Sequence, residues 1–175
     1  LVAANLLVPA PDDITVTRVG SALELRDAVR AAAAQADVVV MAAAVADFRP
    51  QDVPGTKIKK VAGSAPPTIT LVENPDILAE LAHDRLRADQ VVVGFAAETG
   101  DAENTVLALG QAKARRKAAD LLVVNDVSGG KTFGASDSAV HVLDAAGEVL
   151  AEATGTKRDV ADVILDAVVP LLVRP

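Results

Sequence analysis

The sequence predicts an α/β protein with a doubly wound, mostly parallel sheet and helices on both faces. Continuous apolar runs at residues 38–43, 91–98 and 121–125 are typical of strands that are buried on both faces. Stretches typical of helices separate them, which is the pattern of parallel strands joined by right-handed crossovers. Half of the residues are hydrophobic, and only 2% are aromatic, which favours a helix-covered sheet over an all-β sandwich.

The first third of the chain supplies two further strands and a helix. Residues 1–4 resemble the end of a strand already under way, and because the chain opens on Leu1 we expect it to be a fragment. Alternating apolar and polar residues predict a partly exposed strand at 14–19. Ser21-Ala22-Leu23-Glu24 then predicts a capping box and a helix that runs to about Gln35.

A long basic loop is predicted at residues 51–67, where prolines and glycines accompany Lys57, Lys59 and Lys60. Loops of this length in compact domains are usually functional or mobile. A short strand at 68–72 leads to Asn74-Pro75-Asp76-Ile77, which predicts a helix start with Asn as the cap and Asp at the positive end of the helix dipole. The free N–H groups of that turn can bind a ligand.

The last third should hold two helices and a hairpin. A predicted helix at 101–119 carries Lys113, Arg116 and Lys117 on one side. A glycine-containing loop at 127–138, with Lys131 and Phe133, should lie at the same edge of the sheet as the other loops. Strands at 140–143 and 148–151 suit a hairpin, and Thr156 with Asp159 opens a final helix from 157 to about 172. We expect one domain that spans residues 1–175.

Composition excludes several classes of function. The chain has no cysteine, so disulfides, thiolate metal sites and a cysteine nucleophile are excluded. A net charge of −7 argues against nucleic acid and anionic membranes as partners, and with no membrane span or signal peptide in the sequence we expect a cytoplasmic protein. His83 and His141 lack the neighbours of a metal site or triad and are assigned to structure. Neither GxGxxG nor a P-loop occurs.

Two of the buried strands end in the same way, with small residues followed by an aromatic ring and a carboxylate. Asp47, Phe48 and Arg49 follow the first strand, and Phe95 and Glu98 close the second. Ligands bind beyond the carboxyl ends of strands in open α/β sheets, although a core strand with an ordinary polar turn gives the same pattern. A core role is the default for the phenylalanines, and a flat pocket for a base is the alternative.

Positive charge on loops of an acidic protein is the clearest sign of a bound anion. The loop lysines 57, 59 and 60 have no helix to explain them, and lysines contact polyphosphates as point charges, with Mg²⁺ sharing that role. For Lys113 and Lys117 the helix dipole is a sufficient explanation by itself, because cations stabilise the last turn of a helix. Both interpretations of the helix lysines stay open.

Five motifs in this order resemble the CTP-using bacterial phosphopantothenate–cysteine ligase family, which is usually fused behind a flavin-dependent decarboxylase. They are Ala43-Ala44-Val45-Ala46-Asp47-Phe48-Arg49, Lys57-Ile58-Lys59-Lys60, Asn74-Pro75-Asp76-Ile77, Gly94-Phe95-Ala96-Ala97-Glu98-Thr99, and Lys113 to Lys117 followed by Ala119-Asp120 and Asn125-Asp126. The resemblance implies a Rossmann-like domain that dimerises and extends an arm to the partner's site. It also implies CTP, 4'-phosphopantothenate and cysteine as substrates, Mg²⁺ as cofactor, and FMN only if a decarboxylase domain lies upstream.

The same resemblance implies roles for individual residues. Asp47 should hold the ribose or the metal-bound phosphates and is the expected magnesium ligand. Lys57, Lys113 and Lys117 should grip the triphosphate, and Lys57 should assist formation of the acyl-cytidylate as the catalytic residue. Cytosine should lie against the first strand end, the predicted helix start and one aromatic ring, which are Met41, Ala42, Ala43, Asn74, Pro75, Asp76, Ile77 and Phe95.

The sequence departs from the family at its beginning. Family members open this domain with a further strand and a Ser/Gly-rich phosphate loop, whose Asn serves the second step, and nothing before Leu1 supplies them. We therefore expect a single nucleotide-binding ligase domain that lacks this strand and loop. Two other classes stay open: a Rossmann-type nucleotide-binding oxidoreductase whose fingerprint lies in the same segment, and a non-catalytic dimerisation or regulatory module.

Overall fold

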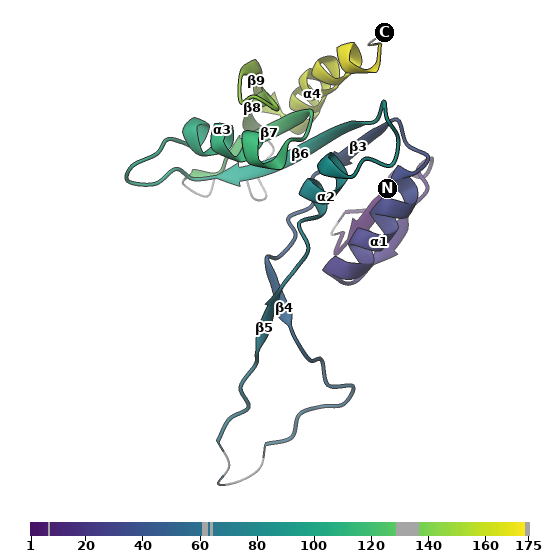
Figure 1. Cartoon of the computed structure of the whole chain (residues 1–175), viewed down its shortest axis with the longest axis vertical. Helices are drawn as coiled ribbons and strands as arrows, with labels where there is room; N and C mark the ends of the chain where they lie inside the picture. Colours follow the sequence, from purple (N-terminus) through teal and green to yellow (C-terminus); the bar gives the residue numbers. More distant parts are fainter. Residues whose placement is uncertain (7, 61–62, 64, 129–136, 174–175) are drawn as a thin grey trace.

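A computed structural model describes residues 1–6, 8–60, 63, 65–128 and 137–173. Among these residues the main sheet has five strands in the order β3-β6-β7-β8-β9 (Figure 1). β3 (Val38–Met41), β6 (Val91–Glu98) and β7 (Leu121–Asp126) are parallel neighbours. β8 (Asp137–Asp144) and β9 (Val149–Thr156) extend the sheet as an antiparallel hairpin. The predicted α/β fold is confirmed.

Helices cover both faces of the sheet because alternate strand residues point to opposite sides. Val92, Leu122 and Val124 belong to a core that includes buried residues of α1 (Ala22–Ala33), α2 (Ile77–His83) and α3 (Val106–Lys117). Val93, Leu121 and Val123 face the other way and pack against Val160, Ile164 and Val168 of α4 (Lys157–Leu172). These six strand residues are almost fully buried, so the centre of the sheet is the rigid part of the molecule.

The first two strands stand apart from the main sheet. β1 (Val2–Ala4) and β2 (Thr17–Val19) form their own parallel pair, and the second is shorter than the strand predicted at 14–19. In the described part of the chain neither β1 nor β2 pairs with β3. A cavity of about 380 Å³ lies between β1, α1 and β3, and Val40 of β3 is 49% exposed beside it. The outer edge of β3 is therefore open.

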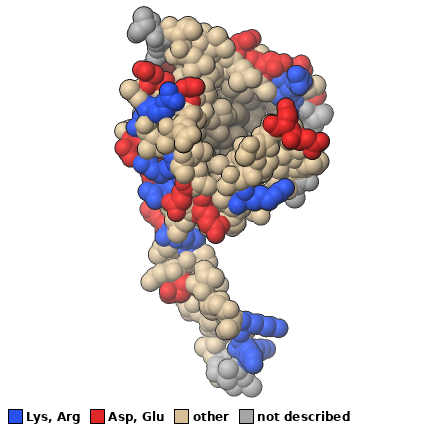
Figure 2. All heavy atoms as spheres, turned by 90° about the vertical axis from the view of Figure 1, so that its right-hand side faces the viewer, with Lys and Arg blue, Asp and Glu red and all other residues tan. Residues whose placement is uncertain are grey.

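A two-stranded arm leaves the body of the molecule after β3 (Figure 1). β4 (Phe48–Pro50) and β5 (Leu71–Glu73) pair antiparallel at its base, and we call these strands and the described residues between them the arm. Lys57, Lys59 and Lys60 are exposed on it. Lys and Arg side chains gather towards its far end in Figure 2. The predicted basic loop is thus carried on a hairpin whose first strand, β4, the sequence did not predict.

The starts of α1, α2 and α3 differ in detail from the predicted ones. Ser21 caps α1 by accepting from the Glu24 N–H, but the Glu24 carboxylate accepts from Gly20 N at 2.7 Å instead of from the cap residue. The cap of α2 is Asp76 and not Asn74, so that assignment was wrong. α3 begins at Val106 behind its cap Thr105 instead of at 101. There Asp101 accepts from the N–H groups of residues 103 and 104, which closes a turn before the helix.

The C-terminal elements follow prediction closely. Thr156 and Asp159 form the predicted capping box, and α4 spans the predicted residues. The hairpin β8–β9 is longer than predicted and turns at Gly147, whose φ of 84° suits glycine. The predicted loop around Lys131 and Phe133 lies outside the described residues. In the part of the chain that the structure covers, no helix has the length and apolar character to cross a membrane.

Candidate functional site

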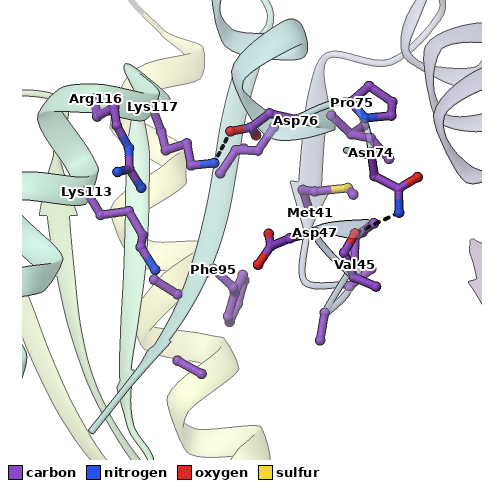
Figure 3. A pocket seen from close by; sticks show the side chains of 17 residues that line it. Met41, Val45, Asp47, Asn74, Pro75, Asp76, Phe95, Lys113, Arg116 and Lys117 are labelled. Atoms are coloured by element: carbon purple, nitrogen blue, oxygen red, sulfur yellow. Dashed lines mark hydrogen bonds and ion pairs between the residues drawn. The ribbon is translucent and has the colours of Figure 1, made fainter. Parts of the chain in front are cut away.

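A pocket of about 430 Å³ opens at the carboxyl ends of β3 and β6 (Figure 3). The two strands are parallel neighbours, with Met41 paired to Gly94, so the residues after each strand emerge at the same edge. The residues after β3 form one wall, the start of α2 a second, and α3 closes the third side with Lys113, Arg116 and Lys117. Segments that are far apart in sequence therefore meet in one cavity.

The pocket collects most of the residues that the sequence nominated. Those that line it are Met41, Ala43, Asp47, Asn74, Pro75, Asp76, Ile77, Phe95, Lys113 and Lys117. Ala42 lies instead on the cavity between β1 and β3. Lys57 lies on the arm and does not line this pocket. Residues not nominated for binding also line the pocket, namely Ala44, Val45, Ala46, Leu78, Ala96, Ala97 and Arg116. The helical spacing that groups Arg116 with the two lysines is the signal that could have included it.

Asn74 ties the segment after β3 to the start of α2. Its side-chain Nδ2 donates to the carbonyl of Ala46 at 2.8 Å, and its backbone N–H donates to the carbonyl of Asp47 at 2.7 Å. Arg49 donates to Asn74 Oδ1 at 3.1 Å and also to the carbonyl of Glu73. These bonds use the side chain that was predicted to cap the helix. They fix the backbone of two pocket walls and the base of the arm to one another.

Asp76 is held in its ionised form at the start of α2. It caps the helix by accepting from Ala79 N at 3.1 Å and forms an ion pair with Lys117 (Figure 3). Burial opposes ionisation, but the hydrogen bonds from Lys117 and Ala79, with the charges of Lys117 and Arg116, outweigh it and lower the pKa of Asp76. A carboxylate therefore already contacts one of the pocket lysines.

The α3 cations stand over the pocket because α3 packs unusually close to the sheet. Gly110 faces Val124 of β7, and a Cβ at this position would lie only 2.6 Å from a methyl carbon of Val124. From this helix Lys113 reaches Glu98 at the end of β6 and forms an ion pair with it. Arg116 lines the pocket and has no hydrogen bond or ion pair within the described residues. The pocket is thus positively charged along one side and partly neutralised by its own carboxylates.

Asp47 is the pocket carboxylate best placed for a metal bound together with phosphate. In the described part of the chain its side chain forms no hydrogen bond or ion pair. The same residues contain no group of three or more His, Asp or Glu side chains that could hold a metal by themselves. Mg²⁺ is commonly held by one or two carboxylates plus substrate phosphates, so a single free carboxylate beside cationic side chains fits such a shared site.

Two phenylalanines and two histidines can be placed. Phe95 is half-buried, packs partly on the core beside α4 and also lines the pocket. Phe48 is 54% exposed at the base of the arm, so a core role is wrong for it. His141 Nδ1 lies 3.2 Å from Glu152 on the neighbouring strand, and His83 ends α2 exposed to solvent. Neither histidine lines the described pocket.

The comparisons with known proteins decide the family. A family model described as "DNA/pantothenate metabolism flavoprotein C-terminal domain" matches residues 1–171. The chain belongs to this family. The bifunctional coenzyme A biosynthesis proteins CoaBC of Mycobacterium bovis and Mycobacterium tuberculosis are relatives, each 47% identical over 173 residues. The match covers 97% of this chain and 41% of each of them, so the chain spans about two fifths of those proteins.

Further family relatives and solved structures agree. The CoaBC protein of Vibrio vulnificus is 40% identical over 149 residues, which covers 85% of this chain and 36% of the relative. The crystal structure of the C-terminal domain of a CoaBC protein superposes with a TM-score of 0.72 at 30% identity, covering 98% of this chain and 74% of that one. A DNA/pantothenate metabolism flavoprotein from Streptococcus pneumoniae, 14% identical with a TM-score of 0.71, shares the fold across 97% of this chain and 79% of its own.

Proposed function

We propose that this chain carries the ligase activity that joins 4'-phosphopantothenate to cysteine at the expense of CTP, in the cytoplasmic synthesis of coenzyme A. The named relatives are coenzyme A biosynthesis proteins, and the similarity runs along almost the whole chain. The observation that carries the proposal is the pocket itself. It brings Asp47, Phe95, the start of α2 and the α3 cations, which come from four separate sequence motifs, around one cavity large enough for a nucleotide.

Cytosine is assigned to the end of the pocket between β3 and α2. Met41, Ala43 and Phe95 line this end, and the Asn74 hydrogen bonds to the carbonyls of residues 46 and 47 fix the segment after β3 to the α2 start. Fixed backbone donors and acceptors can recognise the edge of a pyrimidine, while an aromatic ring supplies a flat face for stacking. This arrangement supports a preference for CTP over ATP.

The phosphates are assigned to the α3 side of the pocket. In the first step the carboxylate of phosphopantothenate attacks the α-phosphate of CTP, pyrophosphate leaves, and an acyl-cytidylate forms. In the second step the amine of cysteine attacks the acyl carbon, loses a proton and expels CMP. Lys113, Lys117 and Arg116 neutralise the phosphate chain. Asp47 would hold Mg²⁺, which would screen the phosphate charge when bound. Bringing the carboxylate and the triphosphate together requires neutralisation of their negative charges, and it requires no nucleophile from the protein.

The arm supports a homodimer in which one protomer completes the site of the other. Lys57 lies outside its own pocket, and the arm projects away from the body (Figure 1). Its apolar side chains at Val53, Ile58 and Ile69 are between 56% and 80% exposed. Packing the arm on a second copy would cover these side chains and bring Lys57 to the partner's α-phosphate, where it would act in acyl-cytidylate formation.

The open groove beside β3 supports the expectation of a further strand. The edges of β1 and β3 both line the cavity of about 380 Å³, and each offers unpaired backbone groups to a strand lying between them. A parallel strand in this place would join β1 and β2 to the main sheet. The loop after it would then emerge beside the pocket, where the family places its phosphate loop.

The proposal is tested by the melting temperature of the chain in the presence of single nucleotides with Mg²⁺. CTP should raise the melting temperature more than ATP at equal concentration, since a ligand stabilises only the state that binds it. Lys113→Gln should reduce the shift, and Lys157→Gln, an exposed lysine at the start of α4, should not. Equal shifts of the melting temperature with CTP and ATP would contradict the proposal that the pocket recognises cytosine. A larger shift with a nicotinamide dinucleotide would favour an oxidoreductase.

A further inference from the structure

The three cations that α3 presents to the pocket differ in what holds them. Lys113 forms an ion pair with Glu98, and Lys117 forms one with Asp76. Arg116 lies between these lysines in sequence and lines the same pocket, yet no described residue gives it a hydrogen bond or an ion pair (Figure 3). Within the described residues, two of the three cations are therefore paired with a carboxylate and Arg116 is not.

Both lysines line the pocket, and so does Asp76, whereas Glu98 holds Lys113 from the end of β6. The side chain of Glu98 is 15% exposed and that of Lys117 is 18% exposed, so each pair has one partner largely withdrawn from water. Glu98 is the last residue of β6, and its backbone carbonyl accepts from Val127 N. Among the described residues, its carboxylate forms an ion pair with Lys113 and with no other side chain. An anion that binds Lys113 or Lys117 therefore competes with a carboxylate for the charge of that lysine.

We propose that Glu98 and Asp76 are resting counter-anions of the two pocket lysines, that a polyphosphate chain displaces them, and that Arg116 is the cation this chain meets first. The inference rests on the proposed function, because it takes the phosphates of a nucleotide as the ligand. Arg116 binds the ligand directly. Glu98 and Asp76 act through the lysines and are positioning residues.

This exchange makes the pocket selective for the length of the phosphate chain. A triphosphate carries enough charge, and enough reach, to replace both carboxylates at once. A nucleoside monophosphate replaces at most one of them, so the carboxylates recover their lysines after pyrophosphate has left. The same ion pairs then assist the release of the nucleotide product.

The test is isothermal titration of the full chain with inorganic tripolyphosphate in the absence of Mg²⁺. Glu98→Gln releases Lys113 and should tighten binding by about 1.5-fold to fivefold, the range that follows from the usual strength of one such ion pair. Arg116→Gln should weaken binding by at least about threefold. Asp37→Asn removes the same charge as Glu98→Gln from a pair with Arg87, outside the pocket, and should have little effect. Arg115→Gln is the matching control for Arg116, since Arg115 bonds the carbonyl of Ala146.

A double variant separates ion-pair exchange from a structural role. In a Lys113→Gln background Glu98→Gln should no longer tighten binding, because no lysine is left to release. Asp76→Asn should tighten tripolyphosphate binding in the same way, by releasing Lys117. The asparagine keeps an acceptor for the α2 cap, so this variant replaces Glu98→Gln in the test if Glu98→Gln does not fold.

The inference is overturned if Glu98→Gln binds tripolyphosphate no better than Asp37→Asn, or more weakly than the parent. Equal affinities of Arg116→Gln and Arg115→Gln would overturn the role of Arg116. Tripolyphosphate has neither base nor ribose, so these outcomes do not depend on whether CTP is the preferred nucleotide or whether the chain forms an amide. If the chain shows no preference for CTP while Glu98→Gln still binds tripolyphosphate more tightly than the parent, CTP is rejected as the substrate. The displacement of the carboxylates by a polyphosphate is then still supported.

Discussion

Gly110→Ala should destabilise the protein even though alanine is the better helix former. Gly110 is buried in α3, and a Cβ there would lie 2.6, 2.9 and 3.2 Å from three atoms of Val124. Carbon atoms pack favourably at about 3.5–4.0 Å, so the helix or the strand has to move by about 1 Å. Val124 is fully buried and β-branched, and its side chain has little freedom to give way.

The size of the effect follows from two opposing contributions to the free energy of unfolding. Replacing glycine by alanine inside a helix stabilises it by about 1 kcal/mol. Overpacking a core costs about 1–3 kcal/mol, and three close atoms place this site near the upper end. The net loss should be about 1–2 kcal/mol, or roughly 2–8 °C in melting temperature for a chain of this size. Because α3 carries Lys113 and Lys117, tripolyphosphate binding should weaken as well.

Chemical and thermal unfolding measure this loss, and two further variants control it. Ala112→Gly, on the exposed side of the same helix, reports helix propensity alone and should leave ligand binding unchanged. Val124→Ala removes the two methyl groups that Gly110→Ala would strike. The double variant should therefore be more stable than the sum of the single losses predicts. A raised melting temperature in Gly110→Ala, or strictly additive losses, would refute the argument from close packing.

Three further outcomes are expected. Lys57→Gln, in a chain that includes the expected phosphate loop, should slow single-turnover formation of the acyl-cytidylate by about 100- to 1,000-fold with little change in CTP affinity. Lys113→Gln should mainly weaken CTP binding, and an unchanged rate in Lys57→Gln would make Lys57 a binding residue only. Light scattering at micromolar concentration should give a dimer mass, and CTP should slow proteolysis of the arm; a monomer mass with unchanged cleavage would reject the arm exchange. The lowered pKa of Asp76 stabilises the fold above the unfolded carboxyl pKa of about 3.9, and this contribution is lost as pH falls through the lower folded value. Asp76→Asn should therefore flatten the acid limb of the unfolding midpoint plotted against pH, and an unchanged limb would contradict the assignment.

Features of the fold that depend on local sequence were predictable. β6 and α4 match their predicted bounds, because an unbroken valine run and a capping box each act within a few residues. β4 was not predictable in the same way. Its residues form a strand by pairing with β5, more than twenty positions later, and the local sequence of Phe48–Pro50 does not predict that pairing. The start of α2 was misassigned because Asn74 and Asp76 are both good caps, and Asn74 is engaged by Ala46.

The residues that line the candidate site were more predictable than the ion pairs that its charged side chains form. Strand ends and helical spacing placed Asp47, Phe95 and the α3 cations at one edge of the sheet, since both patterns depend only on the period of a strand or a helix. The family resemblance supplied Met41 and Ala43 and the role of the α2 start. The partner of Lys117 lies 41 residues away, at the N-cap of α2, and was not foreseen. The position of Lys57 relative to the pocket depends on the direction of the arm, which no local pattern determines.

The open edge of β3 makes association of chains a concern. Val38–Met41 is an uncharged run of three valines and a methionine, and in the described structure only its β6 side is paired. Unpaired, apolar strand edges are templates for intermolecular pairing, which natural sheets prevent by charge, bulges or cover. Within the described residues, β3 carries no charged side chain and no strand pairs with its outer edge. A strand lying in the β1–β3 groove would cover this edge and so would oppose pairing between chains.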